Sequence, residues 1–252
     1  MTKLSSAATA KEAHKVLRTA LTAATRDELV SRNVGMMVPP PTVVSRESQL
    51  WTLDETLAFL GSARKDRLYA AFALAITLGM RRGEIVGLRW SDVDLAGRSL
   101  VVREQVQHVG GELYTGTTKN GKRRPIPLPR IAVVALRWQR LQQAEARRAA
   151  GDKWTETGHI FTTRSGRTVE PTNVYRSFRR IAAEARVPVV RMHDARHGTA
   201  TLLVACGVSP RVVMEILGHS QIGLTMNVYT HVTQDSQREA LANMDRLLNK
   251  RG

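Results

Sequence analysis

Apolar residues recur every three or four positions through most of this chain, the spacing that places them on one face of an α-helix. Residues 11–34 are the first such segment, and we expect a helix there. A single helix cannot bury its own apolar face, so residues 1–35 are expected to be the end of a larger helical unit or a docking arm. Three consecutive prolines, Pro39 to Pro41, cannot continue a helix and predict an extended linker over residues 36–46.

Beyond the linker the same spacing predicts a series of helices. Thr52 and Glu55 have the spacing of a capping box, which opens a helix expected to end near residue 63. Pro129 begins a longer helix that we expect to reach residue 149, with arginines near its C-terminal end, where the helix dipole favours them. Further helices are expected over residues 67–78, 84–89, 172–185, 193–205, 210–217, 223–229 and 235–250.

Strand patterns are confined to the middle of the chain. In residues 100–109, β-branched side chains alternate with other residues, and this pattern predicts a strand. A hairpin is expected next, formed by residues 112–118 and 123–128 around a turn that contains Asn120-Gly121. A short strand is expected at residues 159–163. The predicted fold class is therefore mainly α with a small antiparallel β-sheet (α+β).

The charge balance indicates the kind of partner. The 252 residues include 38 Lys and Arg against 22 Asp and Glu, a formal net charge of +16, and 42% of the residues are hydrophobic. The hydrophobic fraction is sufficient for a folded core. The positive surplus favours a polyanion, and nucleic acid is the usual one.

Membrane attachment and disulfide bonding are both disfavoured by the sequence. No run approaches the roughly 18–20 apolar residues of a membrane-spanning helix, and no signal peptide opens the chain. Cys206 is the only cysteine, so we expect a reducing, cytosolic compartment without an intrachain disulfide. Its apolar neighbours predict that Cys206 is a small buried hydrophobic residue.

Phosphoryl transfer on a nucleic acid without a metal would require a particular set of side chains. The phosphorane that develops in such a reaction needs fixed cations against its non-bridging oxygens, and arginine binds phosphate with two parallel donors. A nucleophile must attack the phosphorus, a base must take its proton, and an acid must protonate the leaving oxygen.

Side chains of these types occur in a compact order. His193 and Arg196 stand three apart at the start of a predicted helix, where a phosphate is also favoured. His219 follows the Leu-Gly that ends another helix, and Tyr229 lies ten residues later. Earlier in the chain, arginines stand between two helices at residues 81 and 82, and Lys119 lies beside the Asn-Gly turn.

The order Arg, Lys, His-x-x-Arg, His and Tyr, with Leu-Gly-His before the Tyr, resembles the tyrosine recombinases, which are the phage integrases and their bacterial relatives. The resemblance covers about residues 46–235 and implies a tyrosine recombinase catalytic domain over residues 47–234. Residues 11–41 are similar to the end of the core-binding domain of these proteins and its linker, which implies that residues 1–35 are a remnant of it and the chain a fragment or shortened form. The helix over residues 235–252 would dock on a neighbouring protomer or fold back on its own core.

The resemblance also assigns roles to individual residues. Arg81 and Arg196 would bind the scissile phosphate, and Glu84 would support the site structurally. Lys119 would be the general acid, His193 the base or proton shuttle, and His219 a phosphate ligand. Tyr229 would form a 3′-phosphotyrosyl intermediate, with no cofactor, metal or ATP.

The activity implied is that of a site-specific recombinase that integrates or excises a phage-like element. Four protomers would act on double-stranded DNA in the cytoplasm, at the nucleoid of a bacterial host. Two alternatives remain at this point. A type IB topoisomerase-like enzyme would use the same chemistry to relax supercoils, and a non-catalytic DNA-binding protein would not need Tyr229.

Some residues in these motifs have ordinary competitors. Arg82 and Lys122 neighbour Arg81 and Lys119, and the register of the family motif selects the latter two. His193 and His197 have the spacing of a metal-binding pair, but no Glu follows in the zinc-protease pattern. We therefore interpret His197 as a packing or hydrogen-bonding residue.

Overall fold

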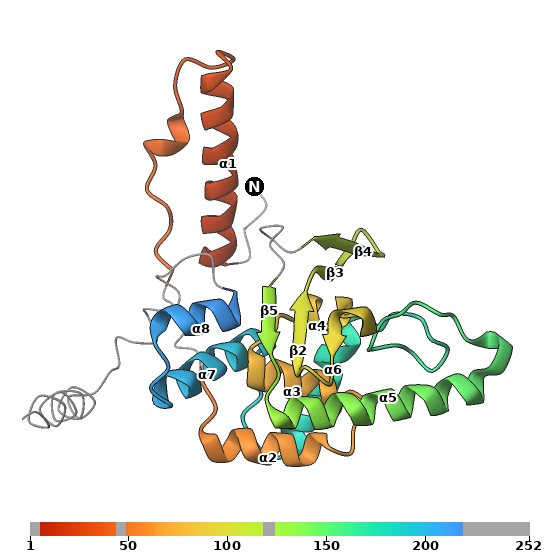
Figure 1. Ribbon diagram of the computed structural model, residues 1–252. Helices are drawn as coiled ribbons and strands as arrows, with labels where there is room; N and C mark the ends of the chain where they lie inside the picture. Colours follow the sequence, from red (N-terminus) through yellow and green to blue (C-terminus); the bar gives the residue numbers. More distant parts are fainter. Residues whose placement is uncertain (1–5, 44–48, 118–123, 219–252) are drawn as a thin grey trace, which may run out of the picture. The chain divides into compact units, whose positions relative to one another are not determined.

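The computed structural model describes residues 6–43, 49–117 and 124–218 of the chain (Figure 1). Contacts between residues divide the chain into two compact units, Met1–Ser48 and Gln49–Gly252. The helices expected over residues 223–229 and 235–250, and the Asn120-Gly121 turn, lie outside the described residues.

The first unit is built on one helix, α1 (Ala7–Arg26), which begins after Ser6, whose side chain accepts a hydrogen bond from the Thr9 backbone. The prediction of a helix to residue 34 was wrong, because Glu28 adopts a positive φ of 58° and turns the chain back. The returning segment, which includes the short 3₁₀ helix η1 (Val34–Met36), is held against α1 by side chains. His14 Nε2 lies 3.0 Å from the Gly35 carbonyl oxygen.

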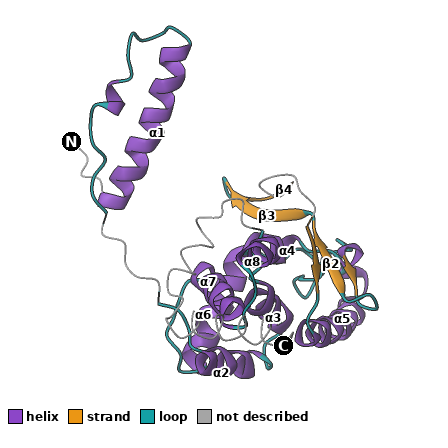
Figure 2. Ribbon diagram, turned by 60° about the vertical axis from the view of Figure 1, so that its left-hand side comes forward, coloured by secondary structure: helices purple, strands orange, loops and turns teal. Residues whose placement is uncertain are grey.

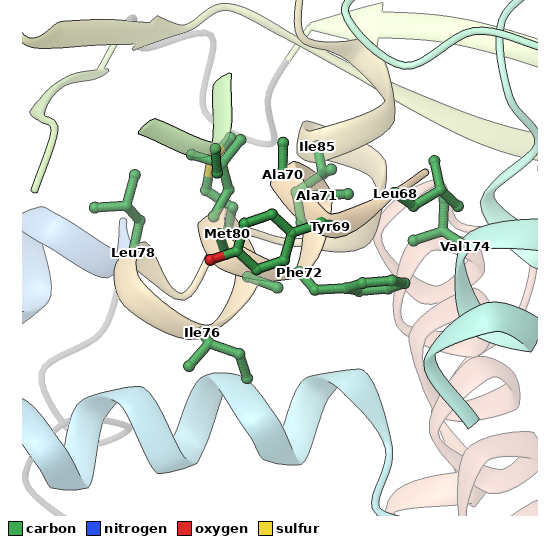
Figure 3. Close-up of a cluster of buried hydrophobic side chains, with 14 of the residues drawn as sticks. Leu68, Tyr69, Ala70, Ala71, Phe72, Ile76, Leu78, Met80, Ile85 and Val174 are labelled. Atoms are coloured by element: carbon green, nitrogen blue, oxygen red, sulfur yellow. The ribbon is translucent and has the colours of Figure 1, made fainter. Parts of the chain in front are cut away.

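The second unit is organised around α3 (Tyr69–Leu78), in which every residue except Thr77 is buried. A helix that is apolar on all sides requires neighbours on all sides. The hydrophobic core built around this helix includes the side chains of Leu68, Phe72, Ile76, Ile85 and Val174 (Figure 3). The helices that pack against α3 are α2 (Leu53–Ala63), α4 (Arg82–Gly87), α5 (Arg130–Ala150) and α7 (Met192–Ala205) (Figure 2).

An aromatic cluster joins α2 and α3 to α6 (Pro171–Glu184). The ring of Phe59 lies 4.7 Å from that of Trp51 and 4.9 Å from that of Phe178, measured between centroids. The Trp51 indole also donates a 2.8 Å hydrogen bond to the Pro188 carbonyl, so its polar end is satisfied. The predicted capping box of Thr52 and Glu55 is present at the start of α2.

The strands form two small antiparallel sheets. One contains β1 (Val93–Asp94), β2 (Ser99–Val102) and β5 (Arg124–Pro127), in the order β1-β2-β5. The other is a hairpin of β3 (Glu104–Val109) and β4 (Glu112–Thr117), which lies over α4 in both views (Figures 1 and 2).

Two predictions about the strands were wrong, one about the extent of a strand and one about which strands pair. The single strand expected over residues 100–109 is divided at Arg103 between the two sheets. The hairpin expected between residues 112–118 and 123–128 does not form, since β4 pairs with β3 and β5 pairs with β2. Gly110 and Gly111, with φ of 60° and 95°, supply the tight turn between β3 and β4. Residues 159–163 make isolated bridges, such as Arg89 with His159, in place of the expected strand.

The remaining helices match their predictions closely. α8 (Pro210–Leu217) has the predicted bounds, and α7 begins one residue before the predicted start. Cys206 was expected to be buried and is exposed at the end of α7. The described helices include none that is both long and apolar enough to cross a membrane. The predicted fold class, mainly helical with small antiparallel sheets, is confirmed.

Candidate active site

Two arginines far apart in the sequence meet where three helices end or begin. Arg81 is the N-cap of α4, three residues after the C-terminal end of α3, and Arg196 lies in the second turn of α7. The Arg196 guanidinium donates to the backbone carbonyls of Gly79 and Leu217, which end α3 and α8. Arg81 Nη2 donates to the next carbonyl, that of Gly218, over 3.3 Å. The two guanidinium groups are therefore held on consecutive carbonyls of one chain segment.

A glycine makes this close approach possible. Gly79 has a φ of 58°, the left-handed conformation that ends many helices. A Cβ at this position would overlap Leu217 Cδ2 and lie 3.4 Å from Arg196 Cγ. Thr199 strengthens the same junction, because its hydroxyl donates a 2.8 Å hydrogen bond to the Ile76 carbonyl and so joins α7 to α3.

A buried carboxylate orients Arg81. Glu84 Oε1 accepts a 2.8 Å hydrogen bond from Arg81 Nη1, and Oε2 accepts a 2.9 Å bond from the Arg81 backbone N–H. The side chain of Glu84 is 4% exposed and that of Arg81 is 38% exposed. The carboxylate thus fixes a guanidinium that still reaches solvent, as expected of a supporting residue.

Arg82, the neighbour of Arg81, points to a different part of the molecule. Its guanidinium carbon lies 5.9 Å from the centroid of the Tyr175 ring on α6. Such an arrangement is a cation–π contact. The structure therefore distinguishes the two arginines, because Arg81 joins the junction of α3, α7 and α8 and Arg82 does not.

His193 lies in the first turn of α7, one helical turn before Arg196. Its ring packs edge-on against that of His197, with centroids 4.8 Å apart. Partial withdrawal from water, followed by the positive charges of His197 and Arg196, lowers the pKa of His193. The pKa of His197 is lowered mainly by burial as well. Both imidazoles therefore favour the neutral form, which can accept a proton.

The start of α7 is fixed by a separate ion pair. Arg191 donates to both carboxylate oxygens of Asp194, over 2.8 and 3.0 Å. The Asp194 carboxylate also accepts from the Arg191 backbone N–H, which closes a capping arrangement. The helical turn that carries His193 is therefore held in place from its N-terminal side.

Of the six predicted site residues, the structure describes Arg81, His193 and Arg196, and the other three, Lys119, His219 and Tyr229, lie outside the described residues. It brings the two arginines together and places His193 on the same helix as Arg196. Sequence reasoning missed Gly79 and Thr199 as residues that shape the junction. The sequence did contain a signal for Gly79, because a glycine directly after the apolar segment of α3 indicates the end of a helix.

Comparison with known proteins shows which family the chain resembles. The family model described as the phage integrase family matches residues 47–236. A XerC-like tyrosine recombinase of Caldanaerobacter subterraneus is 32% identical over 222 residues, which cover 82% of this chain and 56% of the relative. An integrase of Streptomyces ambofaciens is 32% identical over 225 residues, covering 86% of this chain and 58% of the relative. The chain thus spans little more than half the length of these two curated relatives.

Solved structures share the fold. The Tn1549 transposon integrase, in complex with a circular intermediate DNA, matches with a TM-score of 0.76 at 22% identity, over 97% of this chain and 80% of that one. The XerA recombinase matches with a TM-score of 0.62, also at 22% identity, over 90% of this chain and 73% of that one. These similarities establish the tyrosine recombinase fold, and the family match extends over most of the second unit. The chain therefore belongs to the phage integrase family.

Proposed function

We propose that this protein is a site-specific DNA recombinase that cleaves and rejoins DNA strands through a 3′-phosphotyrosyl intermediate. The observation that supports this most directly is the meeting of Arg81 and Arg196 on the carbonyls that end α8, with Glu84 buried behind Arg81. Fixed guanidinium groups of this kind stabilise the charge that develops on a phosphate during transfer.

The two arginines would contribute differently. Arg81 is partly exposed, so a phosphate would reach its guanidinium from solvent. Arg196 is 2% exposed and also joins the ends of α3 and α8, so its role would be both to bind phosphate and to hold the site together. Charge in such a buried position acts strongly, because little water screens it.

The chemical step would be a phosphoryl transfer without a cofactor. The Tyr229 oxygen would attack the phosphorus, forming the tyrosine–phosphate bond as the bond to the 5′ oxygen breaks. His193, whose lowered pKa keeps it neutral, would take the tyrosine proton, and Lys119 would protonate the leaving oxygen. His219 would bind a phosphate oxygen. A 5′ hydroxyl of the partner strand would then reverse the reaction, so neither ATP nor a metal is required.

The partner would be double-stranded DNA that carries an attachment site. The net charge of +16 supports a polyanionic ligand. The Tn1549 integrase and the lambda integrase were both solved with DNA bound.

We further propose four protomers on two duplexes, acting in the bacterial cytoplasm to integrate or excise a phage-like element. Residues 1–35 would be the end of a core-binding domain, joined by residues 36–46 to a catalytic domain over 47–234, with residues 235–252 a helix that can dock on a neighbouring protomer.

A plasmid assay tests the proposal against its alternatives. A supercoiled plasmid with two attachment sites should yield recombined products, whereas a plasmid without sites should remain supercoiled. Relaxation of both plasmids without recombination would favour a type IB topoisomerase-like enzyme. Tyr229→Phe should abolish product formation while leaving binding to the site intact. If the wild type bound its site and neither recombined nor relaxed the plasmid, the protein would be a non-catalytic DNA-binding module.

A further inference from the structure

A second basic site lies at the other end of α3 from the arginine pair. A groove of about 1120 Å³ runs between the C-terminal half of α5 and the turn over residues 162–165, with Arg67 on one wall. Arg67 precedes α3 and Arg81 follows it, so the ten-residue helix separates them by about 15 Å. The C-terminal end of α5 extends away from α7 and α8 (Figure 1). A ligand in this groove is therefore distinct from a phosphate held at the candidate active site.

The floor of the groove is fixed by hydrogen bonds. Gln139 donates to the Ile160 carbonyl over 3.1 Å, and Gln143 donates to the His159 carbonyl over 2.8 Å. Gln143 in turn accepts a hydrogen bond from the Trp90 indole. Farther along α5 the groove is lined by Ala146 and Ala149, whose small side chains do not fill it. The groove is thus a preformed feature of the fold, as ligand sites usually are.

The ionisable side chains that line the groove carry a net positive charge. They are Arg67, Lys153 and Arg164 against Glu145. The Arg67 guanidinium donates to the Thr162 carbonyl, and partial burial together with the positive charge of Arg164 lowers the pKa of Arg67. Within the described parts of the chain, no ion pair is formed by Lys153 or Arg164.

The turn that carries Arg164 adds neutral donors. The hydroxyl oxygens of Thr163 and Ser165 lie 3.1 Å apart, and both residues line the groove. Two arginines of like charge destabilise each other unless an anion lies between them. Guanidinium forks with nearby hydroxyls are suited to the oxygens of a phosphate. We propose that this groove binds a phosphate-bearing ligand, either a backbone phosphate of a second DNA segment or a free phosphorylated small molecule.

The proposal is tested on the whole chain by nitrogen-15 NMR, with inorganic pyrophosphate as the probe. Backbone signals of Thr163 and Ser165 should shift on titration, and Arg164→Ala should weaken this binding at least about fivefold. Arg164→Lys should restore part of it. The matched control is Arg137→Ala, which removes an exposed arginine of α5 that does not line the groove, and it should bind as the wild type does.

Arg81→Ala separates this site from the candidate active site. In that variant the shifts at Thr163 and Ser165 should persist, because the groove does not depend on Arg81. Shifts confined to residues near Arg81 and His193, or equal affinity in Arg164→Ala and Arg137→Ala, would overturn the proposal. The result does not depend on whether the protein recombines DNA.

A second titration identifies the source of the phosphate. A DNA duplex that shifts the Thr163 and Ser165 signals, with the shift lost in Arg164→Ala, would assign the groove to the DNA backbone. Binding of the duplex without these shifts, while pyrophosphate still produces them, would assign it to a free phosphorylated molecule. Absence of the shifts with both probes would contradict a phosphate site.

Discussion

Arg81 and Arg196 donate hydrogen bonds to consecutive backbone carbonyls, those of Gly218 and Leu217. This relationship couples two basic side chains, 115 residues apart in the sequence, to the end of α8. His219 follows Gly218 directly in the sequence. The segment that leads to the proposed phosphate ligand and nucleophile is thus held by the same arginines that would bind the phosphate.

Glu84→Gln should reduce strand cleavage without a comparable loss of DNA affinity. The amide keeps the size of the side chain but removes the charge that orients Arg81 through two hydrogen bonds. We expect cleavage to slow about tenfold and the free energy of unfolding to fall by about 1–2 kcal/mol. Single-turnover cleavage and urea denaturation measure the two effects. Glu215→Gln, which alters an exposed pair with Arg211 on α8, is the control and should change neither quantity appreciably.

Gly79→Ala should destabilise the fold by about 2–4 kcal/mol. The added Cβ would overlap Leu217, and the positive φ of Gly79 is unfavourable for alanine. Gly61→Ala in α2 provides a matched comparison, because a Cβ there meets no atom within 4 Å. That substitution should be neutral or stabilise the helix by up to about 1 kcal/mol. Equal midpoints for the two variants in urea denaturation would show that the junction of α3, α7 and α8 is not tightly packed at Gly79.

Acidification should slow cleavage through protonation of His193. Its pKa lies below the ordinary value of 6.5, so the neutral base is present at neutral pH and is lost as the pH falls through that lowered pKa. The cleavage rate on a pre-bound substrate, measured as a function of pH, should therefore decline on the acid side below 6.5. His193→Gln should lower the rate and remove this decline. A wild-type rate that was already falling at pH values above 6.5 would contradict the assignment of His193 as the base.

Folding stability should depend on pH in the same direction. The lowered pKa values of His193, His197 and His159 mean that the unfolded chain binds protons more tightly than the folded chain. The stability they contribute is present above the unfolded pKa of about 6.5 and declines as the pH falls below it. Denaturation in urea across this range measures the slope, and His159→Gln should reduce it. A stability that rose on acidification would contradict these directions.

Local signals in the sequence were sufficient for several elements and insufficient for others. The capping box of Thr52 and Glu55 and the Pro-to-Gly limits of α8 are determined by neighbouring residues, so their positions were predicted well. The strand pairing was not predicted correctly. Gly110-Gly111 and Asn120-Gly121 are both suitable hairpin turns, and which of them joins two paired strands depends on the sheet to which each strand belongs.

The site shows the same division. The resemblance to tyrosine recombinases identified Arg81 and Arg196, because they match the arginines of the family motif. It did not identify the carbonyls that hold them, because that geometry depends on how α3, α7 and α8 pack. The need for a glycine at position 79 likewise arises from the packing of residues more than a hundred positions away.

In the proposed reaction, Tyr229 forms a covalent bond with DNA. The most direct test is incubation of the protein with duplexes that carry the attachment site and a nick just beyond the cleavage position, so that the short fragment diffuses away and the adduct accumulates. Denaturing electrophoresis should then show DNA attached to the wild-type chain and none attached to Tyr229→Phe. An equal amount of adduct in Tyr229→Phe would contradict Tyr229 as the nucleophile, and absence of adduct with the wild type stably bound to its site would contradict the recombinase chemistry itself.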